Sequence, residues 1–118
     1  MAESDPSCLF CRIVAGEIPA EVVRRTEHTV AIRDIDPQAP THVLVIPLDH
    51  HRDAGSVGRS DPPLAGHLLA DAAAVAAQEG VEGAGYRIVL NTGAGAGQTV
   101  FHVHAHVLGG RPLGWPPG

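Results

Sequence analysis

The order of the apolar segments limits what this chain can fold into more than any other feature of its sequence. Only residues 64–79 combine the length and the helical spacing of apolar residues that a long helix needs, and this segment is rich in alanine. The β-rich runs are short and fall at residues 21–26, 29–33, 42–48, 86–90 and 99–108. Helices and strands thus come in groups and do not alternate as in βαβ units. This order predicts an α+β domain with an antiparallel five-stranded sheet.

The remaining segments are short or irregular. Residues 8–15 have apolar residues at helical spacing and are followed by Gly16, which predicts a short N-terminal helix. Residues 53–63 are rich in Gly, Ser, Asp and Pro and are expected to form the longest irregular stretch. The tail, residues 109–118, contains Trp115, which has no local partner. We expect this ring to dock onto the body of the protein or onto another subunit.

Length and composition are those of one small globular domain. The chain has 118 residues, of which 44% are hydrophobic, so a core can form and disorder is not expected. We expect residues 1–7 to be a flexible N-terminus and residues 8–118 to form a single domain that includes the C-terminal tail.

Charge and the apolar runs argue against several classes of partner. The net charge is −5 and all eight basic residues are arginine, so there is no basic stripe of the kind that binds nucleic acid or a membrane surface. No run approaches the roughly 18 apolar residues of a membrane span, and the N-terminus lacks the regions of a signal peptide. We therefore expect a cytoplasmic protein that binds no nucleic acid and no membrane.

The last β-rich run carries the most informative motif. Side chains in a strand alternate between faces, so His102, His104 and His106 should share one face. Phe101 and the other odd-numbered residues of the run should then face the core. Side chains on one face are roughly 6.6 Å apart, a spacing that suits a row of rings contacting several oxygens of one phosphate. Three histidines in strict alternation, directly after the glycine-rich residues 91–98, indicate a site.

Two kinds of chemistry fit such a row of imidazoles. A neutral imidazole, with an ordinary pKa of about 6.5, can attack phosphorus when its second nitrogen donates a hydrogen bond that fixes the tautomer. Flanking rings can then stabilise the charge on the phosphoryl oxygens. Alternatively, three imidazoles and a water would make a catalytic zinc centre. The sequence offers no obvious carboxylate to orient each imidazole, which argues against that centre.

The run His102-Val103-His104-Ala105-His106-Val107-Leu108 resembles the histidine-triad (HIT) motif. The likeness extends to residues 35–42, Val45-Ile46-Pro47, residues 97–101 and the terminal Trp115-Pro116-Pro117-Gly118, which are similar to the Hint branch of nucleotide-binding purine phosphoramidases. It covers about residues 8–118. The resemblance implies a HIT-like fold whose sheet continues across a homodimer. It also implies cleavage of the P–N bond of purine nucleoside 5′-phosphoramidates or aminoacyl-adenylates through a covalent nucleotidyl-histidine.

The same resemblance implies roles for individual residues. His104 is the nucleophile, with His106 and His102 assisting on either side and His42 as a hydrogen-bonding partner behind them. Thr99 stands where better-known members carry serine and retains the hydroxyl that can donate to a leaving nitrogen. The implied nucleotide-binding residues are Phe10, Ile13, Ile32, Arg33, Asp34, Ile35, Asn91, Gly97, Gln98, Thr99, His104, His106 and Trp115.

Four of these positions have more specific implied contacts. Asp34 is placed to bind the ribose hydroxyls, and Gln98 and Thr99 to hold the phosphate and the leaving group. Arg33 stands where a histidine is common in the family and would add charge near the ribose edge, which leaves the choice between adenosine and guanosine open.

The two cysteines point to a separate site. By themselves, Cys8 and Cys11 are either half of a zinc site or a pair of free, buried cysteines. Bacterial relatives of the family often carry the same pair with zinc, completed by a histidine at the position of His50 and by the first triad histidine, His102. The resemblance therefore implies a structural zinc that the chemistry does not require. His51, next to His50, leaves the choice of ligand open.

Two other functions stay open at this point. A neighbouring HIT branch hydrolyses dinucleoside polyphosphates, which the terminal Trp115-Pro116-Pro117-Gly118 argues against. A nucleotide-binding regulatory module with incidental hydrolysis is the alternative from another class. His28 and His67 have no partner visible in the sequence and are assigned to solvent.

Overall fold

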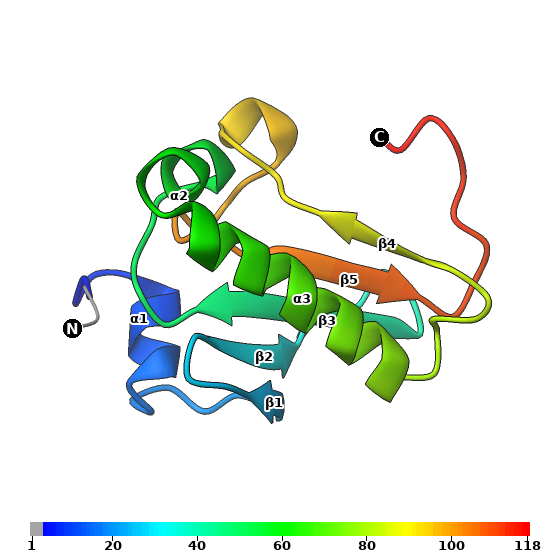
Figure 1. The fold of residues 1–118 in the computed structure, drawn as a ribbon, viewed down its shortest axis with the longest axis horizontal. Coiled ribbons are helices and arrows are strands. Elements are labelled where there is room, and N and C mark those ends of the chain that lie inside the picture. The colour runs from blue at the N-terminus through cyan, green and yellow to red at the C-terminus, as the bar shows by residue number, and fades with distance from the viewer. Residues whose placement is uncertain (1–3) are drawn as a thin grey trace.

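Five strands form one antiparallel sheet in this computed structural model, which describes residues 4–118. The strands are β1 (Val22–Arg25), β2 (Thr29–Arg33), β3 (Thr41–Pro47), β4 (Tyr86–Val89) and β5 (Ala105–Gly109). Their order in the sheet is β1-β2-β3-β5-β4, and every neighbouring pair is antiparallel (Figure 1). The predicted α+β fold with a five-stranded antiparallel sheet is confirmed.

Four helical segments connect or cover the strands: α1 (Leu9–Val14), α2 (Ala54–Ser60), α3 (Pro62–Gln78) and the 3-10 turn η1 (Ala94–Ala96). Asp61 caps the N-terminus of the long helix α3, because its side chain accepts a hydrogen bond from the Leu64 N–H group, and Pro62 is the first residue of the helix. It ends before Gly80, which has a φ of 77°. A side chain at Gly80 would be strained in this conformation. The prediction of a long helix over residues 64–79 is confirmed, but the helix begins two residues earlier than predicted, at Pro62.

The central strand β3 is buried along its whole length and separates two apolar clusters. Val43 and Val45 face α3, whereas Leu44 and Ile46 face the other side of the sheet, where Phe10 of α1 packs. This division follows from the alternation of side chains in a strand. Figure 1 shows α3 across one face and α1 near one end of the sheet. The cluster on the α1 side of the sheet is the smaller of the two.

The histidine run is a strand only in its second half, so the prediction of a strand over residues 99–108 is too long. The last register pair between β3 and β5 joins Val45 to Ala105. Pro47 has no N–H group with which to extend the ladder. The Val103 N–H group instead donates to the carbonyl oxygen of His51, at 2.7 Å. Residues 99–104 therefore follow the loop after β3 and pair with no strand.

Other predictions about irregular segments are also corrected. Residues 53–63 contain α2, because the side chain of Asp53 accepts from the Ser56 N–H group and caps this helix. Phe101 does not enter the core; its ring lies under the guanidinium of Arg52. His28 and His67 are partners, since their rings stack with centroids 3.7 Å apart.

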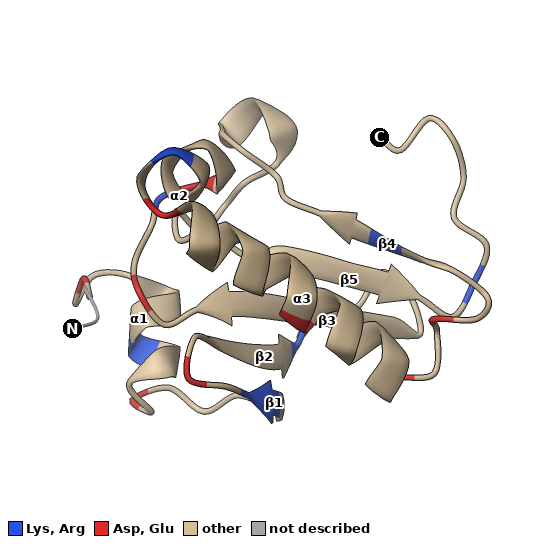
Figure 2. Cartoon of the chain, in the orientation of Figure 1, with Lys and Arg blue, Asp and Glu red and all other residues tan. Residues whose placement is uncertain are grey.

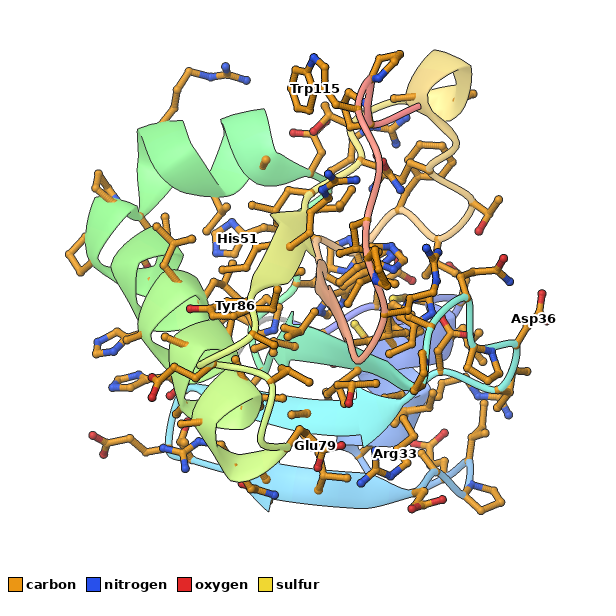
Figure 3. All side chains as sticks on the ribbon, turned by 90° about the vertical axis from the view of Figure 1, so that its right-hand side faces the viewer. Arg33, Asp36, His51, Glu79, Tyr86 and Trp115 are labelled. Carbon is orange, nitrogen blue, oxygen red and sulfur yellow. The ribbon has the colours of Figure 1, made fainter. Side chains whose placement is uncertain are left out.

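The C-terminal tail crosses the sheet edge without docking its tryptophan. Arg87 of β4 donates to the carbonyl oxygen of Gly114 at 2.8 Å, which holds the tail near the sheet. Trp115 itself is 83% exposed, and Figure 3 shows its ring standing away from the body. Of the two alternatives for Trp115, docking onto the body is therefore wrong, and docking onto another subunit stays a prediction.

The remaining expectations concern the N-terminus, the distribution of charge and the absence of a membrane span. Residues 1–3, part of the predicted flexible N-terminus, lie outside the described residues, while the Ser7 N–H group donates to the Asp5 carboxylate at 2.9 Å. Figure 2 shows the arginines of the described chain at separate places and not in a stripe. Within residues 4–118, no helix has the length and apolar character needed to cross a bilayer.

Candidate functional site

A pocket of about 280 Å³ opens on the α1 side of the sheet, beside the second half of the histidine run. It is lined by Leu9, Phe10, Ile13, Ile32, Arg33, Asp34, Ile35, Leu44, Thr99, Val100, His104 and His106. The structure thus brings most of the predicted nucleotide-binding residues together. Leu9, Leu44 and Val100 were not predicted, because their apolar side chains carry no signal that separates a pocket wall from a core.

The apolar part of the pocket is rigid at its base. Phe10, Ile32 and Leu44 belong to one buried cluster between α1 and the sheet. The ring of Phe10 meets the ring of His104 edge to face, with centroids 4.9 Å apart and planes at 89°. The packing of α1 therefore fixes the position of the central triad imidazole.

The tautomer of His104 follows from its hydrogen bond. Its Nδ1 atom lies 2.8 Å from the carbonyl oxygen of His102. A carbonyl oxygen can only accept, so Nδ1 must carry the proton, and Nε2 of the neutral ring keeps a lone pair. Burial lowers the pKa of His104 below its ordinary value, although the hydrogen bond to the His102 carbonyl opposes this shift. The ring is therefore neutral at pH 7 and has one nitrogen available for attack.

His106 is oriented by His42 from the neighbouring strand. The Gln38 N–H group donates to Nδ1 of His42 at 3.0 Å, so the proton of a neutral His42 is on Nε2. That atom lies 2.9 Å from Nδ1 of His106. Burial lowers the pKa of both rings, that of His106 to about 4. His106 therefore accepts at Nδ1 and carries its own proton on Nε2.

Asp34 is the carboxylate that the sequence did not reveal as an orienting group. Its Oδ2 atom lies 3.4 Å from Nε2 of His42, and Asp34, His42 and His106 form one cluster of potential ligand atoms. Sequence reasoning assigned Asp34 only to the ribose, because 8 residues separate it from His42 along the chain. The antiparallel pairing of β2 with β3 brings the two together.

His102 has a different environment from the other two triad residues. It is fully buried, and its Nε2 atom lies 2.9 Å from the carbonyl oxygen of Pro47, to which it must donate. Its Nδ1 lone pair then points toward Cys8, whose Sγ atom is 3.3 Å away. Burial lowers the pKa of His102 to about 4. Both nitrogens are thus engaged away from the pocket, so the expectation of three rings in a row against one phosphate is corrected to two.

Two thiols and two imidazoles meet at the buried end of His102. Cys8, Cys11, His50 and His102 each offer one ligand atom, and all four atoms lie within 4.8 Å of one another. The nitrogens of His50 and His102 are 3.2 Å apart, and Sγ of Cys11 is 3.4 Å from each of them. Tetrahedral bonding to zinc, at about 2.3 Å for sulfur and 2.0–2.1 Å for nitrogen, would place such atoms roughly 3.5 Å apart. The donor set and its spacing therefore fit zinc.

The choice between the two adjacent histidines follows from the geometry. His50 belongs to the cysteine cluster, whereas His51 lies near Asp49 and Asp61. Within residues 4–118, the three triad imidazoles do not form a common group of potential ligands. The alternative of a catalytic centre built from His102, His104 and His106 therefore has no support in the fold.

Four predicted contacts do not line the pocket: Asn91, Gly97, Gln98 and Trp115. The Gln98 side chain is buried and accepts from the Gly93 N–H group at 2.8 Å while donating to the carbonyl oxygen of Arg52 at 2.9 Å. These hydrogen bonds hold the glycine-rich loop of residues 91–98 in place, and the Gln98 side chain does not line the pocket.

Arg33 lines the pocket, but its charge is already compensated. Its guanidinium holds both carboxylate oxygens of Glu79, at 2.6 and 3.0 Å, and contacts Glu21 at 2.9 Å. Figure 3 shows Arg33 and Glu79 facing each other. Bidentate pairing of this kind fixes the guanidinium, so Arg33 does not add a free charge at the ribose edge as expected.

Comparison with known proteins agrees with this fold and site. Residues 15–113 match the HIT domain family. The chain is 42% identical to the purine nucleoside phosphoramidase of Escherichia coli, over 90% of this chain and 89% of that protein. It is 45% identical to the 14 kDa zinc-binding protein of Zea mays, over 97% of this chain and 90% of the maize protein. The chain therefore belongs to the HIT family.

A solved structure shows the same architecture. The crystal structure of a HIT family hydrolase from Legionella pneumophila Philadelphia 1 superposes with a TM-score of 0.91 at 48% sequence identity, covering 95% of this chain and all of that one. The comparisons thus support a hydrolase of the HIT type.

Proposed function

We propose that this chain hydrolyses purine nucleoside 5′-phosphoramidates or aminoacyl-adenylates, with His104 as the nucleophile. The observation that carries the proposal is the hydrogen bond from Nδ1 of His104 to the His102 carbonyl oxygen, because it leaves the Nε2 lone pair free in the pocket. The similarity to the phosphoramidase of Escherichia coli supports the same class of substrate.

The proposed reaction has two displacement steps. In the first, Nε2 of His104 forms a bond to phosphorus and the P–N bond to the amine breaks. The amine takes up a proton, which the Thr99 hydroxyl donates and regains from solvent. In the second step, water attacks phosphorus, His104 leaves as a neutral ring, and the water proton passes to solvent. Because Nδ1 keeps its proton throughout, the nucleotidyl-histidine is cationic and leaves readily.

In this proposal His106 stabilises negative charge on the phosphoryl oxygens and does not donate the proton that the leaving amine takes up. Its Nε2–H group, fixed by the contact of Nδ1 with His42, donates to a phosphoryl oxygen and stabilises the charge that spreads over the oxygens in the transition state. Phe10, Ile32 and Leu44 offer the apolar surface that a purine base needs, and Asp34 offers a carboxylate for ribose hydroxyls. These assignments give seven of the twelve lining residues a role toward the nucleotide.

We further propose that Cys8, Cys11, His50 and His102 hold a structural zinc ion. The fit rests on the buried Nδ1 lone pair of His102 and on donor spacings close to those of a tetrahedron. The zinc-binding relative from maize supports the same metal. Zinc here would tie α1 to the loop after β3 and take no part in the reaction.

A homodimer is part of the proposal because the resemblance to the Hint branch implies one. Among the described residues, Ile35 and Trp115 are the most exposed of the large apolar side chains, at 102% and 83%, and a second copy of the chain could cover them. Sedimentation velocity at a series of concentrations tests this: a dimer is expected, and a monomer at all concentrations would contradict it.

A substrate panel at fixed pH tests the main proposal. We expect turnover of an adenosine phosphoramidate well above that of a diadenosine polyphosphate. The second candidate, a polyphosphate hydrolase, requires the reverse order. Tight binding of AMP with no turnover of either compound would favour a regulatory module and contradict the proposal.

A further inference from the structure

A second and larger pocket adjoins the candidate active site. Its volume is about 490 Å³, and Leu9, Thr99 and Val100 line both pockets. Thr99 is the residue whose hydroxyl we assign to the leaving amine. When a nucleotide fills the first pocket, the group attached to the leaving nitrogen can therefore extend past Thr99 into the second.

An unpaired arginine lies at this second pocket. The guanidinium carbon of Arg52 is 4.4 Å from the centroid of the Phe101 ring, an arrangement that fixes the plane of the guanidinium. Within residues 4–118, no carboxylate lies within 4.0 Å of Arg52, and its side chain donates no hydrogen bond to a described residue. Arg33, in the first pocket, is instead fully occupied by Glu79 and Glu21. Arg52 thus has its N–H groups free.

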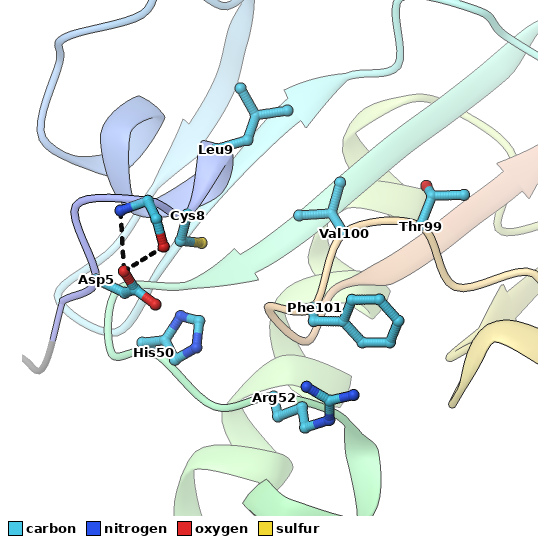
Figure 4. A pocket seen from close by; sticks show the side chains of 9 residues that line it. Asp5, Cys8, Leu9, His50, Arg52, Thr99, Val100 and Phe101 are labelled. Carbon is cyan, nitrogen blue, oxygen red and sulfur yellow. Dashed lines mark hydrogen bonds between the residues drawn. The ribbon is translucent and has the colours of Figure 1, made fainter.

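The other titratable groups of the second pocket lie at a different end. The Asp5 carboxylate accepts from the backbone N–H and the hydroxyl of Ser7, at 2.9 and 2.7 Å. Figure 4 places Asp5 and His50 on one side and Phe101, with Arg52 beside it, on the other. An anion at the Phe101 end would meet Arg52 first.

We propose that this pocket binds the leaving group of the substrate and that Arg52 pairs with a carboxylate on it. The preferred substrates are then phosphoramidates formed with the amino group of an amino acid that keeps its free carboxylate. A guanidinium fork matches the two oxygens of a carboxylate, and an α-carboxylate is only two bonds from the leaving nitrogen. This inference rests on the proposed phosphoramidase function and adds the class of leaving group.

Two matched substrates test the proposal: adenosine 5′-phosphoramidates formed with alanine and with alaninamide. They differ only in the charge that Arg52 would bind. We expect Arg52→Gln to lower kcat/KM for the alanine compound by about tenfold, as for loss of a charge-assisted hydrogen bond, and to leave the alaninamide compound within about twofold. The ratio of kcat/KM for the alanine compound to kcat/KM for the alaninamide compound is compared between wild type and variant. This comparison cancels the intrinsic difference in reactivity between the two leaving groups. Arg52→Lys should give an intermediate ratio, because it keeps the charge and loses the fork.

Arg59→Gln is the control, since Arg59 is a second exposed arginine that does not line either pocket. It should leave both values unchanged. An equal effect of Arg52→Gln on the two substrates, or no effect on either, overturns the inference while leaving the phosphoramidase function in place. If wild type cleaves neither compound, the proposed function fails; calorimetric binding of both compounds still tests the subsite, and affinities with the same ratio in wild type and Arg52→Gln would overturn it.

Discussion

The Nε2 atom of His42 lies 2.9 Å from Nδ1 of His106, and this single contact decides which nitrogen of His106 carries a proton toward the pocket. His42 can donate there because its own Nδ1 accepts from the Gln38 N–H group. The turn before β3 thus sets the tautomer of a residue in β5. Two neutral rings in series give His106 a fixed donor without requiring a charge at pH 7.

Replacing His106 tests its assigned role in charge stabilisation. His106→Asn should lower kcat by about 10²–10³-fold, the usual cost of removing one donor to a developing oxyanion. The loss should be the same for an amine leaving group and for p-nitrophenol, because the donor acts on the phosphoryl oxygens. A loss confined to amine substrates would instead identify His106 as the acid.

Thr99 should show the opposite pattern. Thr99→Val removes the hydroxyl with little change of shape, so turnover of an alkylamine phosphoramidate should fall by about 10²-fold, at the lower end for a general acid. Turnover of the p-nitrophenyl ester of AMP should be nearly unchanged, since that leaving group needs no proton. Thr99→Ser should restore the amine reaction. Equal losses on both substrates would contradict the assignment.

His104→Asn should abolish turnover and retain AMP binding. Asparagine keeps a polar side chain in the pocket but offers no nucleophilic nitrogen. Acid quenching during turnover, followed by mass spectrometry, should show a nucleotidyl adduct on wild type and none on the variant. Turnover in the variant above a thousandth of the wild-type rate would rule out this nucleophile.

Part of the pH dependence of stability follows from the half-buried His106. Its pKa is about 4 in the folded chain and near 6.5 when unfolded, so the unfolded state binds more protons between these values. The free energy of unfolding should therefore fall as pH drops from about 6.5 to about 4, with this residue contributing on the order of 1–2 kcal/mol by pH 5. Urea unfolding at pH 7 and pH 5 measures the slope. His106→Asn should reduce it, and an unchanged slope would show that another group titrates.

Removing one cysteine tests the zinc proposal without using activity. Wild type should carry one zinc per chain by elemental analysis, and Cys11→Ser should carry much less. Burial raises the pKa of the Cys11 thiol to about 11, so zinc must displace its proton, and uptake should release protons measurable in weak buffer. Ser60→Ala, outside the cluster, is the control. Zinc content that is the same in all three proteins would contradict the site.

Much of the fold follows from patterns that are local in sequence. The apolar spacing that predicts α3 and the alternation of side chains that predicts β3 are both visible among neighbouring residues of the chain. The error at residues 99–104 has a different origin. Alternation there continues past the point where a partner strand ends, and the end of β3 at Pro47 is not visible from the histidine run itself.

In the candidate site too, the sequence motifs predict less about contacts between residues that are far apart in the chain. The fold brings together Cys8, Cys11, His50 and His102, the set that the family resemblance implies, and the geometry favours His50 over His51. The engagement of Arg33 by Glu79 joins residues 46 positions apart, and no local pattern predicts that α3 ends beside β2. For the same reason the pairing of His42 with Asp34 and the stacking of His28 on His67 became apparent only in the fold.

His102 links the two proposed sites through two different parts of the same residue. Its imidazole belongs to the cysteine cluster, while its carbonyl oxygen accepts a hydrogen bond from the Nδ1–H group of His104. A shift of this residue when the metal leaves would rotate the nucleophile without any change in the pocket walls. Under the proposed zinc site, chelation should then slow turnover by misaligning the reacting imidazole, although the metal would not contact the substrate.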